Sequence, residues 1–205
     1  MLDLKDRILS TAERLFMRGG IRSVSMDDIA QDLAISKKTL YKCFENKDQI
    51  VLAMTATHLT REAAECEVLL TQADSAVAEL FLMIDWMKSQ FGDVHPSIFF
   101  DLQKYYPESW QLWVAHKNGY ILRQIEDNLR RGIREGLYRA DLDVDVLARL
   151  RLAEIELSFN LELFPPRQYD PQRTMLAMLE HFVLGVATLQ GHRLINKLRQ
   201  VSEGE

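Results

Sequence analysis

Residues 25–47 read SMDDIAQDLAISKKTLYKCFENK, and this stretch contains the signals of two short helices joined by a tight turn. Ser25 is a suitable N-cap for the first helix, and Asp27 and Asp28 place carboxylates at its positive end. After the turn, Ser36 can cap the second helix in the same way. The stretch therefore predicts a helix-turn-helix.

The apolar residues of both helices have the spacing of one buried helical face. Ile29 and Leu33 are four residues apart in the first helix, and Leu40 and Phe44 are four apart in the second. Residues with this spacing point the same way, so the two apolar faces can pack against each other.

The opposite face of the second helix is cationic and carries hydroxyl groups. At about 100° per residue, Lys38, Thr39 and Lys42 lie opposite the apolar face. Lys37 and Tyr41 lie on its flank. Such a helix suits the major groove of DNA, where Lys binds guanine or phosphate and Thr contacts base edges.

A helix with several lysines can also be an ordinary solvated surface, and the charge balance helps to separate the two interpretations. From residue 33 to residue 47 there are four lysines and one acid, whereas the whole chain has 25 Lys+Arg against 30 Asp+Glu. A local reversal of sign in an acidic chain favours an anionic partner, and we therefore predict that this helix binds double-stranded DNA.

Residues 24–52 resemble the N-terminal domain of TetR-type bacterial transcriptional regulators. The resemblance implies a three-helix DNA-binding domain, a larger helical domain for ligand binding and dimerisation, and repression relieved by a small molecule. We therefore expect an all-α fold with an N-terminal helix-turn-helix domain at residues 1–46 and a larger C-terminal domain at residues 47–205. The positions that match the family are Ser25, Ile29, Ala30, Ser36, Lys37, Thr39, Leu40, Tyr41, Phe44, Lys47, Ile50 and Leu52.

The resemblance also assigns roles at the DNA surface. Residues of the second helix would touch DNA, and Lys47 would meet a phosphate at the start of the fourth helix. The residues that we predict to bind DNA are Ser25, Ser36, Lys37, Lys38, Thr39, Tyr41, Lys42 and Lys47.

Two positions depart from the family pattern. Ala34 stands in the turn where glycine is common, which costs about 1 kcal/mol if the backbone there is left-handed. Lys38 replaces another frequent glycine, so a cationic side chain is gained where the backbone would otherwise approach DNA. These departures concern the preferred DNA site rather than binding itself.

The remainder of the chain predicts helices only. The expected helices cover residues 4–17, 46–70, 75–91, 96–104, 107–136 and 144–164, and a last long helix begins at Pro171 and extends to Leu189. The first of these ends at a Gly-Gly pair and would support the helix-turn-helix from behind.

The two C-terminal helices carry more apolar residues than one buried face requires. We interpret the excess as a four-helix interface of a homodimer, and burial entirely within the monomer is the alternative. The predicted interface residues are Phe159, Leu163, Met178, Phe182, Gly185, Val186 and Leu189.

Aromatic and methionine residues are concentrated in the middle of the chain, and most of them suit ordinary core packing. Trp and Tyr also carry polar groups and methionine packs adaptably, so we expect the wall of any pocket for a small apolar or aromatic effector in this region. The predicted ligand-binding residues, which combine apolar bulk with a hydrogen-bonding group, are His58, Trp86, Trp113, Tyr120 and Asn160.

Signals of catalysis, metal binding and membrane insertion are absent from the sequence. The five histidines are scattered, and there is no HExxH motif, Gly-rich phosphate loop or GxSxG motif. The two cysteines do not form a CxxC pair, and no apolar run approaches the roughly 18 residues of a membrane span. We therefore predict a cytoplasmic protein that is not an enzyme and has no catalytic residues, metal or cofactor.

Together these patterns predict a dimeric transcriptional regulator, a repressor released from a near-palindromic operator by an unidentified small-molecule effector. A DNA-binding protein of the same fold controlled by a protein partner is the alternative. A helical enzyme is a remote alternative, because no polar constellation supports it.

Overall fold

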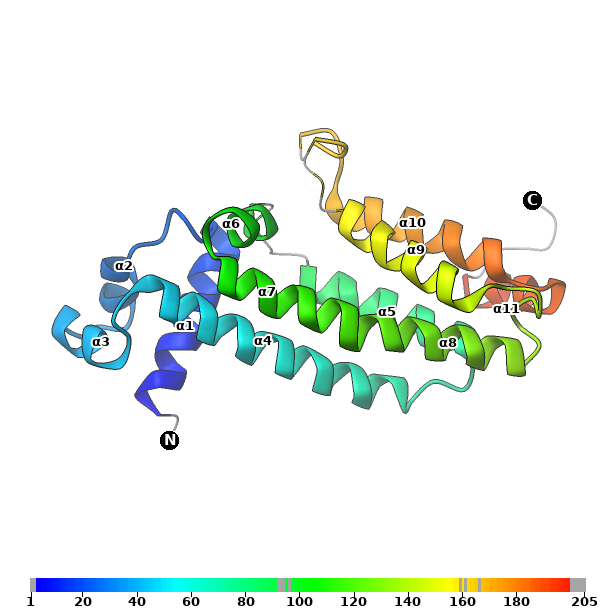
Figure 1. The fold of residues 1–205 in the computed structure, drawn as a ribbon, viewed down its shortest axis with the longest axis horizontal. Helices are drawn as coiled ribbons and strands as arrows, with labels where there is room; N and C mark the ends of the chain where they lie inside the picture. Colours follow the sequence, from blue (N-terminus) through cyan, green and yellow to red (C-terminus); the bar gives the residue numbers. More distant parts are fainter. Residues whose placement is uncertain are drawn as a thin grey trace. The chain divides into compact units, whose positions relative to one another are not determined.

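The computed structural model describes residues 3–91, 95, 97–158, 160, 162–165 and 167–199, and these residues are predominantly helical (Figure 1). Within these ranges, β-structure is limited to an isolated antiparallel bridge between Tyr138 and Ala187. The all-α prediction is confirmed. The helices are α1 (Leu4–Gly19), α2 (Met26–Asp32), α3 (Lys37–Cys43), α4 (Lys47–Leu70), α5 (Ala76–Phe91), α6 (Ile98–Tyr105), α7 (Pro107–His116), the π-helical segment η1 (Lys117–Ile121), α8 (Leu122–Arg134), α9 (Val144–Leu157), α10 (Pro171–Val186) and α11 (Leu189–Arg199).

The chain divides into two compact units. Unit 1 comprises Met1–Glu62 and Asp93–His116, and unit 2 comprises Ala63–Gly92 and Lys117–Glu205. Helix α4 contributes residues to both units, so it links them covalently. The predicted division at residues 46 and 47 stays a prediction, and we note that unit 1 also contains the start of α4 together with α6 and α7.

Unit 1 has a core in which α1 packs against the helix-turn-helix, which lies beside it in Figure 1. Helix α1 has Asp3 as its N-cap and Gly20 as its C-cap, and most residues adopt the φ of 81° at Gly20 only with strain. The core contains the apolar faces predicted for α1, α2 and α3, together with residues of α4 and α6. Its buried side chains include Ile8, Ala12, Phe16, Ile21, Ile29, Ala30, Leu40, Phe44, Ile50, Val51, Met54, Ile98 and Leu102.

Unit 2 has its own core, in which α8 packs against α5 and α9, and α10 packs against α5 and α9. The Asp143 carboxylate accepts a hydrogen bond from the amide of Val146 and begins α9, and Asp170 caps α10 in the same way. Both caps were predicted. The buried side chains of this core include Ala76, Val77, Leu122, Leu129, Tyr138, Ala148, Leu152, Phe182, Val183, Val186 and Ile195.

The predicted helix over residues 107–136 is interrupted by the π-helical segment η1. Contacts with other parts of unit 2 hold this wider turn. Lys117 forms an ion pair with Glu156, and the Tyr120 hydroxyl donates to the carbonyl of Ala63 at 3.0 Å. The Arg123 side chain donates to the Gly119 carbonyl at 2.9 Å. A helical sequence period does not reveal such a local insertion.

Two other helix boundaries were wrong. Helix α9 ends at Leu157 instead of residue 164, because the Asn160 side chain accepts hydrogen bonds from the amides of Glu162 and Leu163 in a turn that competes with helix. The last predicted helix ends at Val186 instead of Leu189, and a further helix that was not predicted, α11, begins at Leu189. The Tyr138–Ala187 bridge lies at the break between α10 and α11.

Candidate nucleic-acid interface

Helix α2 begins with a complete capping box. The Ser25 hydroxyl accepts a hydrogen bond from the Asp28 amide at 3.2 Å, and the Asp28 carboxylate accepts from the Ser25 amide at 2.7 Å. The Ser25 hydroxyl also donates to this carboxylate at 2.6 Å. These hydrogen bonds from Ser25 lower the pKa of Asp28. Ser25, a predicted DNA contact, thus has a structural role in the unbound protein.

The turn between α2 and α3 places Ala34 in the left-handed region, with φ of 53°. The turn is closed by hydrogen bonds from the Ala34 amide to the Gln31 carbonyl and from the Ile35 amide to the Ala30 carbonyl, both at 3.0 Å. The conformation that the sequence flagged at Ala34 is therefore present, and alanine carries its conformational cost.

Helix α3 is held by its cap and by its buried face. The Ser36 hydroxyl accepts from the Thr39 amide at 3.1 Å and lies 2.8 Å from the Thr39 hydroxyl. On the inner side, the Leu40 side chain is fully buried, and the α3 residues Lys38 and Lys42 are exposed. The Tyr41 side chain is 48% exposed. The cationic face predicted from helical spacing is thus open to solvent.

The lysines of α3 differ in their partners. The Lys37 ammonium contacts the carboxylate of Asp27 in α2 at 2.5 Å, and this hydrogen bond and charge raise the pKa of Lys37. Among the residues that the structure describes, Lys38 and Lys42 have no acidic side chain at ion-pair distance. The positive charges that remain unneutralised on α3 therefore belong to Lys38 and Lys42.

Lys47 lies in a different environment from the α3 lysines. Its half-buried ammonium donates to the carbonyl of Ile21 and lies 5.6 Å from the centre of the Phe16 ring. Burial lowers the pKa of Lys47, against the opposing effect of nearby carboxylates such as Asp101. The sequence predicted that Lys47 binds a DNA phosphate. It did not reveal the contact with the Ile21 carbonyl, because the two residues are far apart in the chain.

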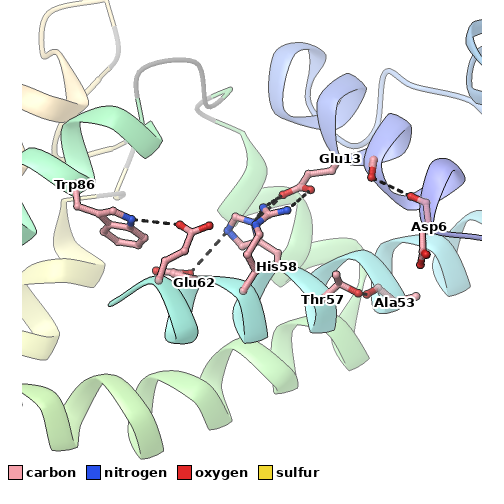
Figure 2. A network of polar contacts seen from close by, with 10 residues as sticks. Asp6, Glu13, Ala53, Thr57, His58, Glu62 and Trp86 are labelled. Carbon is pink, nitrogen blue, oxygen red and sulfur yellow. Dashed lines mark hydrogen bonds and ion pairs between the residues drawn. The ribbon is translucent and has the colours of Figure 1, made fainter. Parts of the chain in front are cut away.

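Two of the predicted ligand-binding residues belong to unit 1. His58 Nδ1 lies 2.8 Å from the Glu13 carboxylate, and His58 Nε2 lies 3.8 Å from that of Glu62 (Figure 2). Trp113 is buried, with its ring edge-to-face with Phe99 at 5.2 Å. Both side chains have partners within unit 1.

The other three predicted ligand-binding residues belong to unit 2. The Trp86 indole donates to the Glu65 carboxylate at 3.3 Å (Figure 2), and Tyr120 bonds Ala63 as described above. Asn160 is exposed, and its amide oxygen is used in the turn after α9. The ligand assignment therefore stays a prediction.

Unit 1 contains an open pocket of about 330 Å³ where α4 and α7 begin. None of the five predicted ligand-binding residues lines it. It is lined by Asn46, Asp48, Gln49, Leu52, Tyr106, Pro107, Glu108 and Ser109.

The predicted dimer residues separate into buried and exposed positions. Phe182 and Val186 are 6% and 3% exposed within the single chain, so they pack in the core of unit 2, as the alternative interpretation held. Leu163, Gly185 and Leu189 are exposed, and Met178 is partly buried. Phe159 lies outside the described residues.

Helix α9 has an exposed apolar face whose residues are absent from the list of predicted interface residues. Val146, Leu150 and Leu157 are 59%, 52% and 41% exposed, and the small residue Ala153 is exposed between them. Their spacing of four, three and four residues places them along one side of the helix. The sequence contains this spacing, but α9 has apolar residues on its other faces as well, so the sequence alone does not show which face is exposed.

Comparison with known proteins agrees with this geometry. Residues 8–54 match the family model described as bacterial regulatory proteins, tetR family. The N-terminal part of the chain therefore carries a DNA-binding domain of the tetR family type. The matched residues include both helices of the helix-turn-helix, α2 and α3.

The chain is also similar to individual regulators. The HTH-type transcriptional repressor KstR2 of Mycolicibacterium smegmatis is 26% identical over 148 residues, which are 71% of this chain and 72% of the relative. A TetR-family regulator from Agrobacterium tumefaciens is 20% identical with a TM-score of 0.73, over 90% of this chain and 97% of that one. A regulator from Saccharomonospora viridis, solved in complex with choline, is 20% identical with a TM-score of 0.71 over the same shares. The structural likenesses concern the fold.

No helix in the described part of the chain is both long enough and apolar enough to cross a lipid bilayer.

Proposed function

We propose that the chain acts as a homodimeric regulator whose two α3 helices enter successive major grooves of a near-palindromic operator. The observation that carries this proposal is the exposed face of α3, where Lys38 and Lys42 are unneutralised beside Thr39. Lysine binds guanine acceptors or phosphate in the major groove, and threonine contacts base edges. Two copies related by a two-fold axis would read two half-sites.

The exposed apolar face of α9 supports the second copy. Val146, Leu150 and Leu157 expose large apolar side chains along one side of α9, and Gly185 of α10 leaves open space where a side chain would stand. A monomer gains nothing from an aligned apolar face in water, whereas burial against a second copy removes it from solvent. We assign the interface to this face in place of Phe182 and Val186.

We propose further that a small apolar or aromatic effector releases the repressor from DNA. The aromatic residues in the middle of the chain support a pocket, and the structural relative from Saccharomonospora viridis binds choline. An effector that binds one conformation better than another shifts the population towards it. Helix α4 passes from unit 1 into unit 2, so a shift in its position would alter the placement of α3.

Binding of purified protein to its operator and to altered operators tests the readout by α3. Lys42→Ala and Thr39→Ala should each relax the preference at particular operator positions by about 1 to 3 kcal/mol where a base contact is lost. Lys197→Ala in α11 is the control, because this exposed lysine lies outside the helix-turn-helix and should leave the preference unchanged. Equal weakening on all sequences would assign the α3 side chains to phosphate contacts.

A further inference from the structure

The start of α2 carries two carboxylates with different roles. Asp28 completes the capping box with Ser25, so its oxygens are used inside the helix cap. Asp27 takes no part in that box. Its side chain is 56% exposed and contacts the Lys37 ammonium of α3 at 2.5 Å. Asp27 therefore joins the two helices of the helix-turn-helix across their exposed side.

The stability gained from this contact is small. Lys37 is 65% exposed, and an ion pair between exposed side chains contributes little to stability because water screens it. The contact has a larger consequence for DNA, because an exposed lysine attracts phosphate and the Asp27 carboxylate beside Lys37 cancels that positive charge. Asp27 lies in the first turn of α2, and its carboxylate faces Lys37, the first residue of α3.

We propose that Asp27 is a specificity-determining residue, which neutralises Lys37 and so limits the sequence-independent attraction of the helix-turn-helix to DNA phosphates. This inference rests on the proposed DNA-binding function. With Lys37 neutralised, the free charge of α3 is confined to Lys38 and Lys42, which lie on the face opposite Leu40. Base contacts then provide a larger share of the total binding free energy, which raises discrimination between sequences.

Asp27→Asn tests the proposal through the salt dependence of binding. The variant adds one positive charge per subunit, so the slope of log affinity against log salt should steepen by about 0.9 per subunit. Between 50 and 200 mM salt, the dimer should lose about tenfold more affinity than wild type. Affinity for a random-sequence duplex should rise more than affinity for the selected operator, which lowers the ratio between them.

Asp32→Asn is the matched control. Asp32 lies in the same helix and forms an ion pair with Arg14 of α1, away from α3. Its removal changes net charge equally, so a smaller effect than that of Asp27→Asn shows that position, not total charge, is decisive. In a second test, Lys37→Met combined with Asp27→Asn should return the salt slope to the wild-type value.

The outcomes separate this inference from the proposed function. A wild-type affinity that does not change with salt would overturn both. If wild-type affinity depends on salt, but Asp27→Asn changes neither the slope of log affinity against log salt nor the ratio of operator to random-duplex affinity, only the role of Asp27 would be overturned. Circular dichroism of each variant checks that the helical fold is retained.

Discussion

The ammonium of Lys47 donates a hydrogen bond to the backbone carbonyl of Ile21, which ties the first residue of α4 to the turn that follows α1. The same ammonium lies over the Phe16 ring. The contact joins the start of the helix that runs into unit 2 to the core of the DNA-binding unit. Phosphate binding by Lys47 stays a proposal, to be carried by its remaining N–H donors.

Lys47→Met should lower the free energy of unfolding by about 1 to 2 kcal/mol, because the Ile21 carbonyl loses a charged hydrogen-bond donor. Urea denaturation measures the change. Lys38→Met is the control, since that exposed side chain has no ion pair among the described residues and its removal should leave stability nearly unchanged. Equal stability of the two variants would contradict a structural role for Lys47.

Ala34→Gly should raise the free energy of unfolding by about 0.5 to 1 kcal/mol, because glycine adopts a φ of 53° without steric cost. Part of the gain is offset by the greater freedom of glycine in the unfolded chain. Ala30→Gly, at a buried position within α2, should have the opposite sign. Thermal unfolding of both variants provides the comparison, and a loss at Ala34 would refute the strain assigned to the turn.

Glu13 makes the stability of unit 1 depend on pH. Burial alone would raise the pKa of Glu13, but hydrogen bonds from His58 and Arg61, together with their charges, lower it from 4.5 to about 2 (Figure 2). A carboxyl whose pKa is lower in the folded state stabilises the fold above its unfolded value of 4.5, and this contribution is lost as the pH falls towards 2.

Glu13→Gln should therefore be less stable than wild type at neutral pH, and the difference should shrink as the pH falls below 4.5. Arg61→Leu removes both hydrogen bonds that Arg61 donates to Glu13, so the acid-induced loss should begin at higher pH than in wild type. Denaturation at a series of pH values measures both effects. A difference between wild type and Glu13→Gln that is independent of pH would contradict this assignment.

The proposed dimer interface is tested at α9. Leu150→Glu adds a charge to a side chain that is 52% exposed, so the monomer should stay folded while the dimer dissociates. Val186→Glu adds the same charge in the core of unit 2 and should unfold it. Analytical ultracentrifugation and circular dichroism distinguish the two results. A Leu150→Glu variant that sediments as an unchanged dimer would place the interface elsewhere.

The helix-turn-helix was predictable because its signals are local. The caps at Ser25 and Ser36 and the spacing of Leu40 and Phe44 all fall within a few residues of the structure that they determine. The position of the positive φ, Ala34, was also marked in the sequence, because glycine is common there in the family pattern.

The remaining features depend on contacts between distant parts of the chain. The Lys37–Asp27 pair crosses the turn, and the Lys47–Ile21 contact joins residues 26 positions apart. The π-helical segment depends on contacts with α4 and α9. Burial of Phe182 and exposure of Leu150 have the same apolar signature in sequence, so composition did not separate core from interface.

Sequencing the DNA fragments that the purified protein retains from sheared genomic DNA tests the central claim most directly, with the Thr39→Ala, Lys42→Ala double variant processed in parallel. The wild-type protein should enrich a near-palindromic motif whose half-sites are separated by about one helical turn or a multiple of it. The double variant should enrich a motif that is degenerate at defined positions within each half-site. Fragments whose sequences match the input DNA would contradict sequence-specific binding by α3.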